Sequence, residues 1–123
     1  MPKFQNELKI KMDEYVHLIY KLTRKYPREE LYGVTSQIRR SSLSVILNYT
    51  EGFARRKRAI QINFLEISYG SLKESKYLLY FSLKEKYIEN EDYKKSLMLA
   101  DEIGAMLWTE MKTLEKSIKN NKK

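Results

Sequence analysis

Residues 36–56 read SQIRRSSLSVILNYTEGFARR, and this stretch places polar side chains where a helix in a protein interior normally carries apolar ones. Steps of three and four residues, the spacing of one helical face, connect a seam that contains serine and asparagine. Its members are Leu31, Val34, Ile38, Ser41, Val45, Asn48 and Gly52. A buried amide or hydroxyl without a partner costs about 1–3 kcal/mol. The seam therefore predicts either a hydrogen-bond network between helices or a site that meets another chain.

The same spacing continues on both sides of this stretch and predicts four helices. The first ends before Pro27, and Thr35 or Ser36 is a plausible N-cap for the second, which runs to about Gly52. The third follows the basic turn 55–58 and extends to about Lys86, and the fourth begins after residues 89–90. No strand-like alternation occurs. We therefore expect one all-α domain over residues 1–119, an antiparallel up-down four-helix bundle, with a flexible basic tail at 120–123.

Composition narrows the classes of protein further. The 123 residues include no cysteine, which excludes disulfides and thiolate metal sites. No apolar run approaches the roughly 20 residues that cross a bilayer, and the start lacks the apolar segment of a signal peptide, so we expect a cytoplasmic protein without membrane contact. Residues 1–60 carry 13 Lys or Arg and 6 Asp or Glu, so most of the net charge of +8 lies in the first half. Such an excess favours polyanionic partners, although a merely soluble basic protein has it too.

Catalytic patterns are sparse. His17 is the single histidine, and with no cysteine it cannot form a nucleophile pair or a histidine-rich metal site. A carboxylate di-metal bundle needs a Glu-x-x-His pair on each of two helices, which one histidine cannot supply. Glycine-rich phosphate loops are also lacking. We expect no enzymatic activity, no metal and no cofactor.

Three motifs resemble one protein family. They are YGVTSQIRR at residues 32–40, NYTEG at 48–52 and FLEISYGSLKE at 64–74. In this order they resemble the four-helix bundle proteins encoded in intervening sequences of bacterial 23S ribosomal RNA genes. A related branch contains the accessory variability proteins of diversity-generating retroelements. The resemblance implies a barrel-shaped homopentamer that binds nucleic acid, RNA or DNA, with a reverse transcriptase as a candidate partner.

The pattern of the family falls on eight positions of this chain, two of them glycines. The positions are Gln37, Arg40, Asn48, Glu51, Gly52, Gly70, Ser71 and Glu74. Arg40, Glu51 and Glu74 could form a functional site that Asn48 orients. We favour the alternative that the six polar residues form an interior network between helices, because a charge between packed helices is tolerated only when it is paired.

Basic residues concentrate in two turns and predict the nucleic-acid contacts. The candidates are Arg24, Lys25, Arg28, Arg39, Arg55, Arg56, Lys57 and Arg58. In an up-down bundle the two turns lie at opposite ends, and no carboxylate within the turn 55–58 offsets its four cations. Such residues contact phosphates with little sequence information. The alternative is that they are solvated loop charges.

Three tyrosines of the third helix, Tyr69, Tyr77 and Tyr80, fall on the side opposite its core face. Tyrosine is enriched at protein interfaces and also stacks on unpaired bases. We favour contact between subunits. Two functions therefore stay open: a non-enzymatic, nucleic-acid-binding oligomer that serves as an accessory factor, and an oligomeric scaffold that binds proteins but no nucleic acid.

Overall fold

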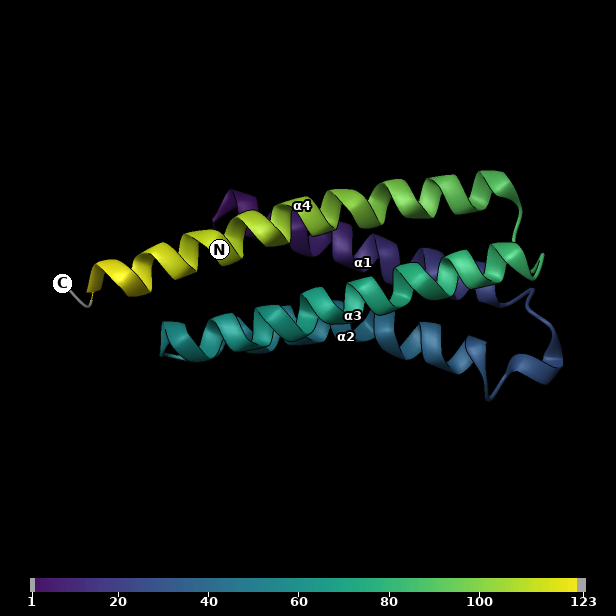
Figure 1. The fold of residues 1–123 in the computed structure, drawn as a ribbon, viewed down its shortest axis with the longest axis horizontal. Coiled ribbons are helices and arrows are strands. Elements are labelled where there is room, and N and C mark those ends of the chain that lie inside the picture. The colour runs from purple at the N-terminus through teal and green to yellow at the C-terminus, as the bar shows by residue number, and fades with distance from the viewer. Residues whose placement is uncertain (1, 122–123) are drawn as a thin grey trace.

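Each break in the helical pattern of the sequence is a turn in the structure. The computed structural model describes residues 2–121 and contains four long α-helices. They are α1 (Lys3–Thr23), α2 (Val34–Phe53), α3 (Arg58–Lys84) and α4 (Asn90–Asn121), and a short 3₁₀ helix, η1 (Arg28–Glu30), lies between α1 and α2. No strand occurs among the described residues. Successive helices run in opposite directions along one long axis (Figure 1). The prediction of an all-α four-helix bundle is confirmed.

The helices are arranged in a ring of neighbours. α1 packs against α2 and α4, and α3 also packs against α2 and α4. The α1–α2 connection lies at the same end of the bundle as the α3–α4 turn, whereas the α2–α3 turn lies at the other end (Figure 1). The two basic turns predicted from the sequence are therefore at opposite ends, as expected.

Three predicted helix boundaries differ from the structure. α1 ends at Thr23 and not directly before Pro27. α2 begins at Val34, with Gly33 in the N-cap position and no side-chain cap. The expected N-caps have other roles: Thr35 is buried, and the Ser36 hydroxyl donates to the Gly33 carbonyl at 3.1 Å. At the other end of the chain, α4 continues to Asn121, two residues into the predicted tail. Residues 122–123 of that tail lie outside the described residues.

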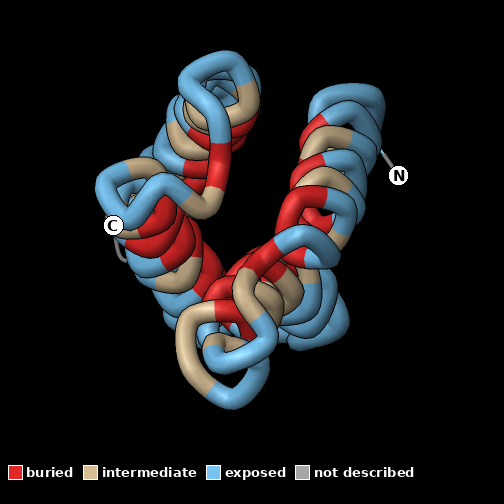
Figure 2. The backbone as a smooth tube through the Cα atoms, turned by 90° about the vertical axis from the view of Figure 1, so that its right-hand side faces the viewer, coloured by how far each residue is buried: buried red, intermediate tan, exposed pale blue. Residues whose placement is uncertain are grey.

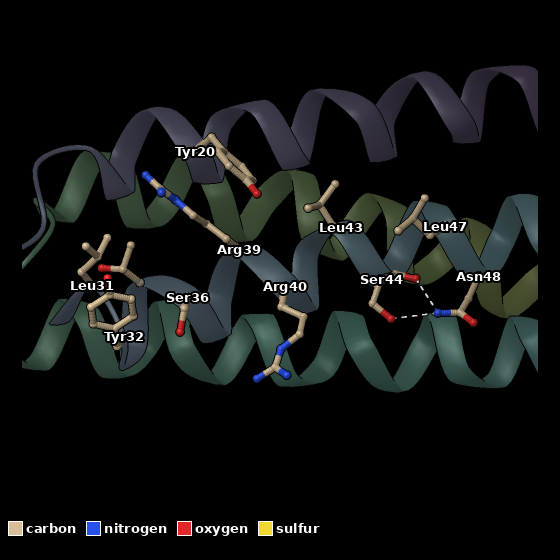
Figure 3. Close-up of a pocket in the computed structure, with 11 residues that line it drawn as sticks. Tyr20, Leu31, Tyr32, Ser36, Arg39, Arg40, Leu43, Ser44, Leu47 and Asn48 are labelled. Atoms are coloured by element: carbon tan, nitrogen blue, oxygen red, sulfur yellow. Dashed lines mark hydrogen bonds between the residues drawn. The ribbon is translucent and has the colours of Figure 1, made fainter.

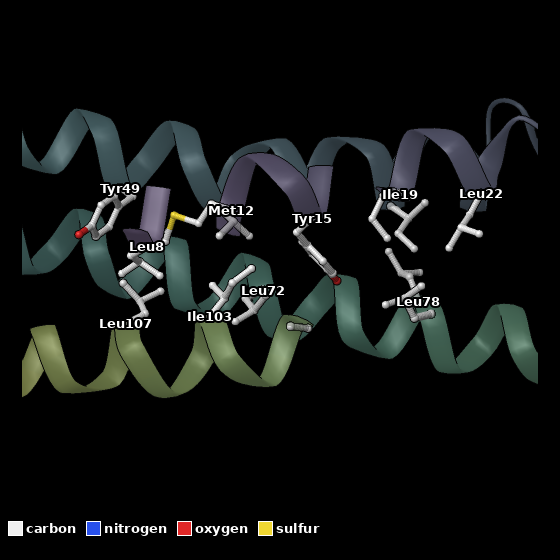
Figure 4. Packing of buried hydrophobic residues seen from close by; sticks show 14 of the residues in the cluster. Leu8, Met12, Tyr15, Ile19, Leu22, Tyr49, Leu72, Leu78, Ile103 and Leu107 are labelled. Atoms are coloured by element: carbon white, nitrogen blue, oxygen red, sulfur yellow. The ribbon is translucent and has the colours of Figure 1, made fainter. Parts of the chain in front are cut away.

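Apolar side chains spaced by three and four residues build the core. The predicted series from Leu8 to Tyr26, which runs through α1 into the connection after it, is buried at every position. Leu72 of α3 and Ile103 and Leu107 of α4 pack against it (Figure 4). Viewed along the bundle, the buried stripes of the helices face its middle (Figure 2). Burial of such side chains is the main term that stabilises the fold.

Polar groups inside the bundle are satisfied in two ways. Buried serines donate to backbone carbonyls, and the Ser68 hydroxyl does so across helices, to the Val45 carbonyl at 2.6 Å. Tyrosine hydroxyls connect the helices that face each other across the middle of the bundle. The Tyr15 hydroxyl of α1 is hydrogen-bonded to the Ser75 hydroxyl of α3 at 2.8 Å, and the Tyr49 hydroxyl of α2 donates to Glu110 of α4. Burial raises the pKa of both tyrosines. These bonds allow the serines and Tyr15 and Tyr49 to occupy core positions with their hydroxyls paired, whereas the buried hydroxyl of Tyr26 has no partner among residues 2–121.

Candidate nucleic-acid interface

The turn between α2 and α3 holds the densest group of cations. Arg55 pairs with Glu51 one helical turn earlier, and its guanidinium lies 5.2 Å from the centre of the Phe64 ring. No carboxylate within residues 55–58 offsets the four cations, but Glu51 of the preceding helix α2 neutralises Arg55. The other three cations, Arg56, Lys57 and Arg58, are exposed and pair with no carboxylate of residues 2–121.

Backbone dipoles add to this positive charge. Lys57 occupies the N-cap position of α3 and Arg58 is the first helical residue, while the first turn holds no acidic residue. The N-terminus of a helix carries a partial positive charge of about half a unit, so cations here oppose the dipole by roughly 0.3–1 kcal/mol each. A helix start with this composition favours anions. The turn is electrostatically suited to phosphate groups.

The second basic group lies at the opposite end of the bundle. Arg24, Lys25 and Arg28 are exposed around the end of α1 and η1. Arg39 of α2 is half-buried and fixed in place: its Nε donates to the Thr23 hydroxyl at 2.8 Å, and its guanidinium lies 4.7 Å from the centre of the Tyr20 ring. The eight predicted basic residues thus form two groups that the single chain does not bring together.

Four of the six polar residues of the predicted network do meet. Gln37 and Arg40 of α2 and Ser71 and Glu74 of α3 surround a pocket of about 470 Å³, together with Ser41 and Ser44. Ser44 and Ser71 are hydrogen-bonded across the two helices at 2.8 Å. Gln37, Arg40 and Glu74 are exposed, so in the single chain this polar pocket lies at the surface and not in the interior.

The remaining two residues of that set lie outside the pocket. Asn48 is linked to the pocket through Ser44, which lines it: the Asn48 amide donates to the carbonyl and the hydroxyl of Ser44 at 2.9 and 2.8 Å. Glu51 is exposed and interacts with Arg55 instead. The buried carboxylate of the chain is Glu110, which also accepts a hydrogen bond from Gln5 at 2.9 Å. Glu110 lies three residues after Leu107 and so falls on the core face of α4. Its burial was not predicted, because a charged side chain at such a position is normally exposed.

Two of the three predicted tyrosines of α3, Tyr77 and Tyr80, lie outside the core as expected, whereas Tyr69 packs partly against it. Tyr77 is 63% exposed and Tyr80 46% exposed. Tyr69 is half-buried because its ring packs on that of Trp108, with the ring centres 5.5 Å apart. Trp108 is itself 47% exposed and was not predicted as a surface residue. The α3–α4 side of the molecule therefore presents a patch of aromatic rings.

The α1–α2 side of the molecule carries a groove that was not predicted from the sequence. It has a volume of about 570 Å³ and runs along α2 beside α1 (Figure 3). Leu31, Tyr32 and Leu47, which are 45%, 93% and 61% exposed, line it. The exposed faces of an amphipathic helix are polar in an ordinary monomer, so Leu43 and Leu47 on the outer side of α2 were the available signal.

Groups for other chemistry do not converge among the described residues. No three or more His, Cys, Asp or Glu side chains of residues 2–121 gather as they would around a metal ion. His17 lies at the surface with its Nε2 3.4 Å from Asp13. No helix in the described part of the chain is long and apolar enough to cross a membrane.

Together these features define an all-α four-helix bundle protein with charged ends, a polar surface pocket and an aromatic patch. The family model of the 23S rRNA-intervening sequence proteins matches residues 5–109, and the chain belongs to this family.

A solved structure has the same fold. It is the crystal structure of a protein with unknown function from the S23 ribosomal protein family of Bacteroides thetaiotaomicron. The two chains are 28% identical and superpose with a TM-score of 0.82, over 89% of this chain and 98% of the other. No curated protein matches the chain. The family resemblance seen in the sequence is confirmed, and with it the bundle.

Proposed function

We propose that this protein is a non-enzymatic, nucleic-acid-binding oligomer whose principal ligand is RNA. The observation that carries the proposal is the cationic turn at the start of α3, where Arg56, Lys57 and Arg58 pair with no described carboxylate and the helix dipole has the same sign. Cations placed against a dipole cost stability, and a polyanion repays that cost. The excess of positive charge in residues 1–60 acts in the same direction.

An oligomer would strengthen such contacts. A homopentamer repeats the turn around a ring, so that five weak contacts act together on one long ligand. A closed ring of five needs a head-to-tail interface, in which two different patches meet. Tyr77 and Tyr80 provide one patch. A groove of about 650 Å³ beside Leu97 and Met98 provides another, on the part of α4 where Glu102 pairs with Lys11 of α1.

A reverse transcriptase is the protein partner that the related accessory variability proteins suggest. Copurification with a reverse transcriptase from the native cell tests this part of the proposal. A pulldown that recovers RNA without such an enzyme would retain the nucleic-acid function and reject the partner.

The decisive experiment compares two charge-matched variants across a salt series. Arg56→Gln with Arg58→Gln removes two cations of the turn, whereas Lys86→Gln with Lys95→Gln removes two exposed lysines near the opposite end of the bundle, in the α3–α4 turn and in α4. The first pair should weaken binding to a structured RNA and lower the slope of log affinity against log salt by about 1.5–2, following counterion release. The second pair should bind like the parent. Circular dichroism should show equal helix content in all three proteins.

Equal binding by all three proteins would contradict a role for this turn. If the parent binds no RNA and no single-stranded DNA at low salt, the nucleic-acid function itself is wrong. The oligomeric protein-binding scaffold then becomes the better explanation of the aromatic patch and the grooves.

A further inference from the structure

The corner between α1, η1 and α2 contains a second, smaller cavity that the proposed turn contact does not involve. Its volume is about 300 Å³, and three arginines, Arg24, Arg28 and Arg39, line it. None of them pairs with a carboxylate of residues 2–121. Glu30, the acidic residue of η1 nearest in sequence to α2, does not line the cavity and accepts a hydrogen bond from Tyr87 at 2.9 Å. Three unpaired guanidinium groups around one cavity suit a phosphate group.

Two groups, the half-buried Arg39 and the buried Thr35, show that this cavity is more than a gathering of surface charges. Arg39 is held by Thr23 and by the Tyr20 ring, so its position is fixed before any ligand arrives. Thr35 also lines the cavity, is only 3% exposed, and its hydroxyl has no hydrogen-bond partner within residues 2–121. A buried hydroxyl without a partner is unfavourable by about 1–3 kcal/mol, and an unpaired acceptor or donor of a ligand would relieve that cost.

The arginine cavity adjoins the apolar groove of Figure 3. Leu31, Thr35 and Arg39 line both, so the two are continuous. The Tyr20 ring that supports Arg39 belongs to the groove, and Tyr32 stands at its η1 end with 93% of its surface exposed. A cationic, anion-binding site joined to an apolar groove with a tyrosine beside it matches a ligand that carries a phosphate next to a flat, weakly polar ring.

We propose that this corner binds one unpaired nucleotide of a nucleic-acid strand, its phosphate in the cavity lined by Arg24, Arg28 and Arg39 and its base in the adjoining groove beside Tyr32. The inference rests on the proposed function and specifies its substrate class, single-stranded over double-stranded. A paired base is stacked inside its helix and cannot enter the groove, whereas an unpaired base offers both faces to an aromatic ring. The phosphate could be internal or terminal in the strand.

The test measures binding of a short oligouridine and of an RNA duplex of equal length to the parent and to Tyr32→Ser, with Ile67→Ser as the control for an exposed, large hydrophobic side chain outside the groove. Loss of one base–tyrosine stack should weaken oligouridine binding by roughly 5- to 100-fold and leave duplex binding unchanged. Ile67→Ser should retain single-strand binding within about twofold of the parent, since it leaves the groove intact. Oligouridine carrying 4-thiouridine should crosslink to Tyr32 or its neighbours in the groove on irradiation.

Arg28→Gln tests the phosphate half, because Arg28 is exposed and its replacement leaves the core intact. It should lower the salt slope of single-strand binding by about 0.7, the share of one phosphate contact. If a 5′-phosphate on the oligouridine raises parent affinity and Arg28→Gln abolishes that gain, the phosphate is terminal. If the 5′-phosphate changes nothing while Arg28→Gln still weakens binding, it is internal.

Two results would overturn the inference while leaving the proposed function intact. One is unchanged oligouridine binding by Tyr32→Ser when Arg56→Gln with Arg58→Gln weakens it. The other is an equal loss of single-strand and duplex binding in Tyr32→Ser, which would mean that the groove recognises no base. If the parent binds neither RNA, the proposed function and this inference fail together.

Discussion

At the scale of single residues, two glutamates of this bundle have opposite environments. Glu51 was expected in an interior network, yet it is about half exposed and pairs with Arg55 on its own helix. Glu110 is 8% exposed and receives hydrogen bonds from Tyr49 and Gln5. An exposed pair of this spacing contributes only about 0.3–0.5 kcal/mol, because water screens it. The hydrogen bonds donated to a buried carboxylate contribute far more to the free energy of unfolding, because their loss leaves a buried charge without a partner.

Removing one donor from Glu110 should therefore be costly. Tyr49→Phe is expected to lower the free energy of unfolding by roughly 1–3 kcal/mol, because it leaves a buried carboxylate oxygen without its partner. Glu51→Ala should change the same quantity by less than about 0.5 kcal/mol. Urea denaturation of both variants measures the difference. Replacing both partners, Tyr49→Phe with Glu110→Leu, should recover much of the loss; a double variant as unstable as the sum of its single changes would contradict the assignment.

At the scale of helices, two glycines differ in how closely another helix packs against them. A Cβ on Gly52, in the last turn of α2, would lie 3.1 Å from the Phe64 Cβ and 3.2 Å from the Gln61 carbonyl oxygen of α3. A Cβ on Gly70, in the middle of α3, would meet nothing within 4 Å. The family pattern contains both glycines, but only Gly52 has a packing reason within one chain. Gly70 leaves an open spot on the surface beside Tyr69.

The two positions should respond to alanine in opposite directions. Gly52→Ala is expected to destabilise the fold by about 1 kcal/mol or more, because backbone atoms of α3 must move away. Gly70→Ala should stabilise it by about 0.5–1 kcal/mol, since alanine favours the helix and nothing opposes its methyl group. Thermal and urea unfolding of the two variants test the signs. A stabilising Gly52→Ala would show that the α2–α3 contact is looser than the structure indicates.

The helices also show which features of the fold could be predicted from the sequence. Helical spacing predicted all four helices and most of their core residues, because burial of one stripe repeats every three to four residues, as in the series from Leu8 to Tyr26. Leu31, the first member of the predicted seam of α2, is instead 45% exposed, because it lies before the helix, directly after η1. Helix starts were less certain, since Ser36 resembles an N-cap although its hydroxyl donates within the first turn. Exposure of Gln37, Arg40 and Glu74 could not be predicted, because polar residues next to a core seam occur both inside networks and at groove edges.

At the scale of the whole molecule, the sequence placed the basic turns at opposite ends but gave no sign of the two-part pocket. The arginine cavity combines Arg24 and Arg28 with Arg39, which lies on another helix, and the groove depends on how far α2 stands from α1. Such features arise only when helices are packed. The fold also leaves the α3–α4 side, with Tyr77 and Tyr80, on a different side of the bundle from the groove beside α1 and α2. Assembly through the tyrosines therefore leaves the proposed nucleotide site open.

This separation yields a prediction about assembly. The parent should be a homo-oligomer at micromolar concentration, a pentamer of about five times the chain mass of 14.8 kDa. Tyr77→Glu with Tyr80→Glu should release monomers, because a stable interface cannot bury two unpaired carboxylates at its aromatic centre. Light scattering after size exclusion gives the mass of each species.

Tyr32→Glu places the same charge on the groove side and serves as the control; it should leave the oligomer intact. A parent that elutes as a monomer would contradict the interface, and a dimer would retain the tyrosines as contacts but exclude the ring. If Tyr32→Glu instead breaks the assembly while Tyr77→Glu with Tyr80→Glu does not, the groove beside α1 and α2 is the subunit contact. It would then be closed to a nucleotide in the assembled protein.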